Sequence, residues 1–221
     1  EESLLSVVPT DGKTPYKPRK IVEASVDTGS FFEIGHDWGR GIVCGFARLD
    51  GYPVGILAGD PFFLDGAWTA DVCDKVTRHM DLCSQFHLPV VHFVDCPGFA
   101  VGVKAETAGA TRAGVRAMTA IYQADVPVCS VVIRKAYGLA GSAMMNQSRT
   151  KWRYCWPSGD WGSLPMAGGI EAAFRKELAE AEDPEALKAQ LYKKFDAIRS
   201  PFRTAESFYA EEIIDPRDTR P

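Results

Sequence analysis

One stretch limits the fold of this chain more than any other. A run of apolar residues at 128–133 leads into a turn of small residues at 134–142, and the following segment, 142–149, is compatible with a helix. The pattern predicts a buried strand, a tight turn and a helix start. Because a helix start leaves its first N–H groups without partners, such a turn can aim backbone donors at one point, as an oxyanion hole does. A purely structural turn fits the same pattern.

A second unit of the same kind lies earlier in the chain. The apolar run 90–94 predicts another buried strand, and a small-residue turn at 95–102 follows it. From Glu106 onward the spacing of apolar residues is helical again. Apolar residues also recur at three- and four-residue steps over 69–87, which predicts a helix that Pro89 terminates. Successive strands and helices in this order indicate an α/β fold with helices covering the strands.

Asp50-Gly51 between two apolar runs, 41–49 and 52–58, is a strong hairpin signal. Neither a G-x-G-x-x-G nor a P-loop motif is present, so the sequence does not predict a nucleotide-binding unit. The other expected elements are an extended N-terminal arm or linker over 1–20, a helix over 21–26, strands over 31–34 and 152–157, helices over 165–178 and 184–198, and a polar tail over 210–221.

Composition narrows the classes of function. The chain has 221 residues, 46% of them hydrophobic, which is enough for one full core. A net charge of −4 speaks against nucleic acid as a partner, and no apolar run is long enough to predict a transmembrane segment. The six cysteines and four histidines lack metal-ligand spacing, so no metal site is expected. Asp95 and Glu106 are interpreted as caps of turns and helices rather than as an acid pair.

Several motifs in matched order resemble one known family. The chain has D-x-P-G-F-x-x-G at 95–102, G-x-x-R-x-G at 109–114 and R-K-A-Y-G at 134–138. This series is similar to that of the carboxyltransferase (β subunit) family of biotin-dependent acyl-CoA carboxylases, the propionyl-CoA and acetyl-CoA carboxylase type. Shorter stretches at 31–34, 156–158 and 214–220 look like the same family in the same order, so the resemblance runs nearly end to end.

The resemblance implies an α/β, crotonase-like (ClpP/crotonase) β-β-α superhelix domain. Family members pair two such domains, and this chain resembles only the C-terminal half. We therefore expect an arm over 1–20 and a C-terminal carboxyltransferase domain over 21–221, with an N-terminal half on the same or a separate chain needed for activity. The chain begins at Glu1 rather than Met, which agrees with a piece of something longer.

The implied function is transfer of a carboxyl group from carboxybiotin to the α-carbon of an acyl-CoA, with this chain as the carboxybiotin-binding half. Carried over residue by residue, the backbone N–H groups of Leu139 and Ala140 would hold the ureido oxygen of carboxybiotin. The family's cofactor-binding positions fall on Tyr137, Gly138, Gly98 and Phe99. The biotin anion would remove the α-proton itself, so neither a side-chain base nor a metal is implied here.

The chain departs from the family in two places. Leu139 stands where the family usually has Gly, and a backbone donor survives that change only if the local φ suits a side chain. Gly141 and Ser142 stand where the family often has a Tyr-Asp pair linked to selection of the acyl chain. A roomier, less charged pocket would follow, and an acyl group other than acetyl or propionyl.

The resemblance also implies partners: a biotin carboxylase, a biotin carboxyl carrier component and a hexamer-type homo- or hetero-oligomer, in the cytoplasm or an organelle matrix. Two alternatives stay open at this point. The chain is compatible with a subunit of a biotin-dependent acyl-CoA decarboxylase, which passes carboxybiotin to a membrane pump. It is also compatible with a non-catalytic scaffold half, because of the change at Leu139.

Overall fold

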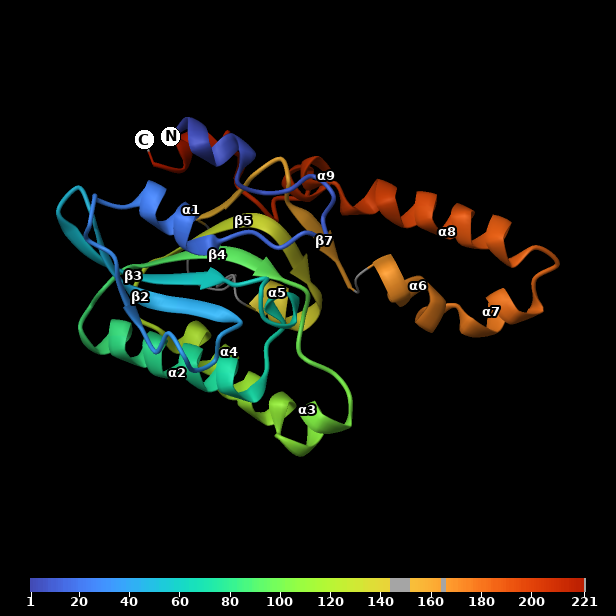
Figure 1. Cartoon of the computed structure of the whole chain (residues 1–221), viewed down its shortest axis with the longest axis horizontal. Coiled ribbons are helices and arrows are strands. Elements are labelled where there is room, and N and C mark those ends of the chain that lie inside the picture. The colour runs from blue at the N-terminus through green and yellow to red at the C-terminus, as the bar shows by residue number, and fades with distance from the viewer. Residues whose placement is uncertain (144–151, 164–165, 221) are drawn as a thin grey trace.

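The computed structural model describes residues 1–143, 152–163 and 166–220, which form a sheet with helices on both faces (Figure 1). The sheet has eight strands in the order β1-β2-β3-β4-β5-β6-β8, and β7 also pairs with β5. The strands are β1 (Phe32–Ile34), β2 (Ile42–Leu49), β3 (Tyr52–Gly59), β4 (Val90–Cys96), β5 (Val128–Tyr137), β6 (Arg153–Cys155), β7 (Asp160–Gly162) and β8 (Glu212–Ile213).

The α-helices are α1 (Pro18–Ser25), α2 (Ala70–Gln85), α3 (Val103–Thr107), α4 (Ala110–Gln123), α5 (Gly138–Ala143), α6 (Met166–Ala173), α7 (Arg175–Glu180), α8 (Pro184–Arg199) and α9 (Pro201–Glu206). Short 3-10 helices cover Glu2–Ser6, Leu64–Gly66 and Pro216–Thr219. Most of the helix predicted over 142–149 lies outside the described residues.

The first three strands are antiparallel, and the predicted hairpin is confirmed. Leu49 pairs with Tyr52, and the two residues between them, Asp50 and Gly51, have φ angles of 49° and 82°. Two left-handed residues in a two-residue loop are the requirement of a turn that matches the twist of the strands, which explains the Asp-Gly pair.

From β3 onward the sheet is parallel, so the carboxyl ends of these strands lie at one edge. Strand β5 continues to Tyr137, so the sequence-based end at Ile133 was wrong. The reason is a partner far along the chain: Lys135 and Tyr137 pair with Asp160 and Gly162 of β7. The turn therefore starts at Gly138, and the chain goes directly from strand into α5.

Helices α2 and α4 cover one face of the sheet, below it in Figure 1. The prediction for α2 is confirmed, and the hydroxyl of Thr69 accepts a hydrogen bond from the N–H of Val72 at its start. Small residues of α4, namely Ala113, Gly114 and Ala117, are buried and permit close packing. This layer contains the larger apolar core cluster, with Trp68 fully buried.

The opposite face carries α1 and the N-terminal segment. The arm expected over 1–20 contributes to the core here, because Leu4 and Tyr16 are buried in the second apolar cluster. The ends of the described chain lie side by side above this face in Figure 1, where Arg217 pairs with Glu2 at 3.1 Å.

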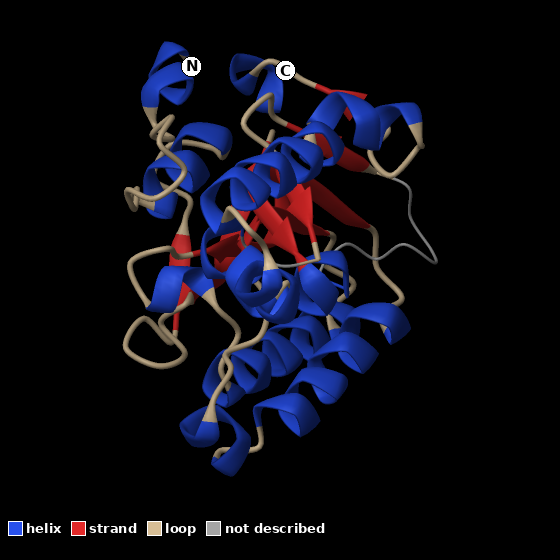
Figure 2. Cartoon of the chain, turned by 90° about the vertical axis from the view of Figure 1, so that its right-hand side faces the viewer, coloured by secondary structure: helices blue, strands red, loops and turns tan. Residues whose placement is uncertain are grey.

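Helices α6, α7 and α8 form an arm that extends away from the sheet (Figures 1 and 2). The rings of Phe174 and Phe195 pack at 5.7 Å between centroids and hold the arm together. At its base, Arg199, the last residue of α8, reaches back to the end of β5. Within the described residues, no helix is both long and apolar enough to cross a lipid bilayer.

Candidate active site

Three loops meet at the edge formed by the carboxyl ends of the parallel strands. We call residues 97–102 the β4 turn and residues 138–140 the β5 turn. A Cβ atom built on Gly98 would lie 3.8 Å from the carbonyl oxygen of Tyr137, and one built on Gly138 would lie 3.3 Å from that of Ser163. The two small-residue turns found in the sequence are therefore neighbours in space, next to the chain that leaves β7.

The β4 turn is fixed by its own backbone. The N–H of Trp68 donates to the oxygen of Gly98 at 3.0 Å, and the N–H of Ala100 donates to the oxygen of Trp68 at 2.9 Å. The half-buried ring of Phe99 packs edge-on to Trp68 at 6.1 Å and fills the space beside Gly114. Gly98 and Phe99, expected as cofactor-binding residues, therefore also stabilise the conformation of the β4 turn.

The β5 turn places backbone N–H donors at the start of a helix. Gly138 has a φ of 59°, which favours glycine, and α5 begins there. Leu139 and Ala140 lie in the first helical turn, whose N–H groups have no acceptor within the helix. Leu139 is not among the residues with positive φ, so the replacement of the family's Gly by Leu costs the backbone nothing. Its side chain is 62% exposed, whereas Ala140 is buried.

Gly141 lies where α5 packs against β5. A Cβ atom at Gly141 would lie 2.6 Å from the carbonyl carbon of Ala136. The missing side chain therefore lets α5 approach β5 closely, and the expected effect of Gly141 on substrate choice stays a prediction. The side chain of Ser142 lies outside the described part of the chain, so its expected effect on substrate choice stays a prediction.

Tyr137 points into the protein, with 3% of the residue exposed. Its hydroxyl donates to Asp160, accepts from Arg199, and its ring lies 5.0 Å from the Arg199 guanidinium carbon. Burial, assisted by the Asp160 carboxylate, raises the pKa of the Tyr137 hydroxyl well above its ordinary value. Sequence reasoning missed Asp160 and Arg199, because only the tertiary fold brings them to Tyr137.

A buried ion pair lies beneath both turns. Asp95, at the end of β4, pairs with Arg134 of β5 at 3.0 Å and accepts a hydrogen bond from the N–H of Lys135 at 3.1 Å. Burial raises the pKa of the Asp95 carboxyl, and the Arg134 guanidinium opposes that rise. The interpretation of Asp95 as a cap is therefore wrong, whereas Glu106 is exposed on α3. Lys135 forms its own ion pair with Asp65.

Potential metal ligands do not gather in the described part of the chain. Over residues 1–143, 152–163 and 166–220, no three His, Cys, Asp or Glu side chains form a group that could hold an ion. Burial raises the pKa of the Cys96 thiol, close to the β4 turn, to about 12. That thiol therefore stays protonated at neutral pH and is a weak nucleophile.

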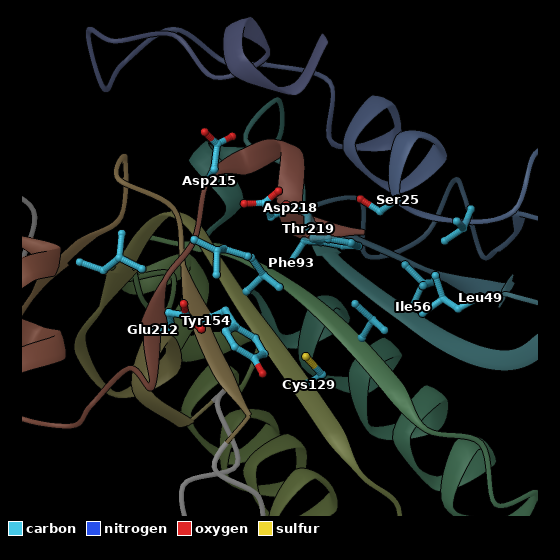
Figure 3. Close-up of a pocket in the computed structure, with 15 residues that line it drawn as sticks. Ser25, Leu49, Ile56, Phe93, Cys129, Tyr154, Glu212, Asp215, Asp218 and Thr219 are labelled. Carbon is cyan, nitrogen blue, oxygen red and sulfur yellow. The ribbon is translucent and has the colours of Figure 1, made fainter. Parts of the chain in front are cut away.

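A cavity of about 530 Å³ opens on the other side of the sheet, under the C-terminal tail (Figure 3). Apolar residues of the strands, such as Ile56, Phe93 and Val131, line it together with Asp215 and Asp218. From Cys129, which also lines it, to the β5 turn the chain is extended strand, a span of roughly 30 Å at about 3.3 Å per residue. This cavity therefore lies apart from the two turns.

The architecture, a mixed α/β sheet with the crotonase-like fold, defines the structural class of the protein. It superposes on the crystal structure of the transcarboxylase 12S hexamer, solved with methylmalonyl-coenzyme A, with a TM-score of 0.91 and 33% identity over 100% of this chain and 43% of that one. The profile of the carboxyl transferase domain matches residues 1–221. The chain belongs to the carboxyl transferase domain family, as the motifs predicted.

Two relatives illustrate the range of this family. The methylmalonyl-CoA carboxyltransferase 12S subunit of Propionibacterium freudenreichii subsp. shermanii is 35% identical over 219 residues, covering 98% of this chain and 42% of the relative. The methylmalonyl-CoA decarboxylase subunit alpha of Veillonella parvula is 34% identical over 222 residues, covering 100% and 42%. The chain thus spans about two fifths of the length of the relatives it matches.

Proposed function

We propose that this chain is the carboxybiotin-binding half of a biotin-dependent acyl-CoA carboxyltransferase. The observation that carries the proposal is the β5 turn: in a chain that matches the family throughout, the N–H groups of Leu139 and Ala140 occupy the first turn of α5 beside the β4 turn. Two fixed donors at one point suit an oxygen that gains negative charge.

The residues present fit the group that this chemistry requires. Carboxybiotin, when bound, supplies the carboxyl group and leaves negative charge on its ureido oxygen. The N–H groups of Leu139 and Ala140 would hold that oxygen, and Gly138, with its positive φ, would set their direction. Because α5 packs closely on β5 at Gly141, the donors have little freedom to move before the charge develops.

The remaining parts of the function extend beyond this chain. An N-terminal half, on the same or another polypeptide, binds the acyl-CoA, and the assembly is hexameric, as the transcarboxylase 12S structure is. Biotin carboxylase and carrier components load the biotin. All six cysteines are free, and five of them are buried, which supports a reducing compartment such as the cytoplasm or an organelle matrix.

Reverse transcarboxylation tests the proposal. The native assembly purified through this chain is given biocytin as acceptor and a panel of carboxylated acyl-CoAs as donors. We expect turnover with one donor preferred. Leu139→Pro removes one N–H donor and should lower turnover by about 100-fold, whereas Leu139→Gly keeps the donor and should stay close to wild type.

Absence of turnover with every donor, in an assembly that contains an N-terminal half, would contradict the proposal and favour a scaffold role. The Leu139 variants separate the two further, because a scaffold half would be indifferent to the loss of one N–H.

A decarboxylase subunit is the second candidate, favoured by the 34% identity to the Veillonella parvula decarboxylase subunit alpha. The same donors would serve the same half-reaction in the opposite direction. Purification of the native assembly in mild detergent distinguishes them: a sodium requirement together with a membrane-embedded partner would assign the decarboxylase, and activity without either would assign the carboxyltransferase.

A further inference from the structure

We propose that Arg199 is a positioning residue that fixes the β5 turn through Tyr137 and Asp160. The inference rests on the proposed function, since the β5 turn is the element it controls. No sequence motif points to Arg199, which lies far along the chain at the end of a predicted surface helix.

The contacts form a closed triangle. The Nε of Arg199 donates to Oδ1 of Asp160 at 2.7 Å, and its Nη2 donates to both Oδ2 of Asp160 and the Tyr137 hydroxyl. The Tyr137 hydroxyl donates to Oδ2 of Asp160. The guanidinium carbon also lies 5.0 Å from the centroid of the Tyr137 ring. Each of the three groups is therefore held by the other two.

Limited exposure makes these contacts stronger than a surface ion pair. The side chain of Arg199 is 14% exposed, that of Asp160 31%, and Tyr137 is buried. Partial desolvation weakens the competition from water and strengthens charge-assisted hydrogen bonds. It also means that loss of the guanidinium leaves the Asp160 carboxylate without its cationic partner in the triangle, and Tyr137 without the hydrogen bond and cation that orient it.

The triangle joins three elements at the point where the donors begin. Tyr137 is the last residue of β5 and precedes Gly138 directly. Asp160 starts β7 and lies opposite Lys135 in the sheet. Arg199 ends α8, where a cation also suits the negative end of the helix dipole. A shift of the Tyr137 side chain would therefore turn the peptide plane from which α5 starts, and with it the N–H groups of Leu139 and Ala140.

A cavity adjoins the triangle at Arg199. Arg199 lines an apolar cavity of about 330 Å³ between β7 and the helical arm, together with Trp161, Phe174 and Phe195. Loss of the guanidinium would remove the contact that holds the Tyr137–Asp160 pair on the side of this cavity. The cavity also gives a small cation a route to the vacated position, which makes chemical rescue a fair test.

The experiment compares Arg199→Met with a matched control on the same helix. Lys188 of α8 pairs with Glu171 of α6 at 2.7 Å, so Lys188→Met removes an ion pair of the arm that does not touch Tyr137. Both variants are prepared in the native assembly. One readout is reverse transcarboxylation, and the other is amide hydrogen exchange of α5, which needs neither biotin nor acyl-CoA.

For Arg199→Met we expect kcat to fall by about 100-fold, as small misplacements of reacting groups do, with KM for the carboxylated acyl-CoA within about twofold of wild type. Exchange of the α5 amides should rise about tenfold. Arg199→Lys, or guanidinium added at millimolar concentration to Arg199→Met, should restore part of the kcat. Lys188→Met should match wild type in both readouts.

Two results would overturn the inference: α5 exchange in Arg199→Met equal to that in Lys188→Met, or a kcat loss that the control shows in equal measure. Failure of the proposed function gives a different pattern, in which the wild-type assembly does not turn over while Arg199→Met still loosens α5. That pattern would support the positioning role of Arg199 and contradict the proposed carboxyltransferase function.

Discussion

The β4 turn and the β5 turn occupy equivalent places, each following a parallel strand at the same edge, yet they are held by different means. The β4 turn is fixed by backbone hydrogen bonds to Trp68 and by the ring of Phe99. The β5 turn is held by the residues on either side of it: the side chain of Tyr137 is anchored by Asp160 and Arg199, and the backbone at Gly141 packs closely on the backbone of Ala136.

The difference determines what each turn can offer to a ligand. Backbone groups that pair within the protein are no longer available for other partners. A turn held by its neighbouring side chains keeps its own N–H groups free while it stays in place, as an oxyanion hole requires. The β4 turn is thus suited to support, and the β5 turn to binding. The following variants test this contrast, from the largest expected effect to the smallest.

Asp95→Ala should break both turns at once. Asp95 is buried beneath them and pairs with Arg134, and removal of one partner of a buried pair costs about 3–5 kcal/mol. Urea unfolding of the assembly measures the loss of unfolding free energy. Asp74→Ala, which removes an exposed pair with Arg116, should lose at most about 1 kcal/mol. Equal losses in the two variants would show that the buried pair does not support the turns.

Phe99→Ala should weaken the β4 turn alone. Its ring is half-buried against Trp68, so we expect a loss of about 2 kcal/mol, below that of a fully buried ring. Hydrogen exchange should rise in the β4 turn and remain unchanged in α5. Phe208→Ala, at a highly exposed ring, is the control and should shift stability by less than about 0.5 kcal/mol. A rise of exchange in α5 comparable to that in the β4 turn would contradict the separation.

Gly138→Ala should disturb the β5 turn alone. A side chain at a φ of 59° costs about 1 kcal/mol, and its Cβ would also lie 3.3 Å from the oxygen of Ser163. Gly109→Ala has a similar φ of 73° but open space around it, so it isolates the backbone cost. We expect similar losses in thermal unfolding, with transcarboxylation lowered only in Gly138→Ala. Equal activity in both would mean that the direction of the β5 turn is unimportant.

Much of this fold follows from local signals in the sequence. The Asp50-Gly51 hairpin and the spacing of apolar residues in α2 are each determined by nearby residues, and the structure confirms them. Of the two predicted strand–turn–helix units, the first is confirmed by β4 and α4, whereas most of the helix predicted for the second lies outside the described residues. The motif at 95–102 spans the end of β4, whereas the turn expected from Arg134 begins only at Gly138, because β5 continues to Tyr137. The carboxybiotin role of Leu139 and Ala140 stays a prediction.

Where the sequence misled, the cause is a contact between distant residues. Strand β5 is longer than its apolar run because β7 pairs with its end. Asp160 and Arg199 were missed because only the tertiary fold brings them to the Tyr137 hydroxyl, and the cofactor-binding role of Tyr137 stays a prediction. The close contact of Gly141 with Ala136 likewise depends on how α5 packs on the sheet. Local patterns carry no information about such partners.

The strand β8 has a consequence for how the chain acquires its structure during synthesis. β8 pairs with β6, and beyond it Arg220 bonds to Asp27 across 193 residues of sequence. These contacts cannot form until the segment 212–220 has left the ribosome, so the emerging chain carries β6 with an unpaired edge until then. Unpaired edges favour association with other chains, and long-range closures are slow. Nascent chains of this protein should therefore depend on chaperones until β8 emerges.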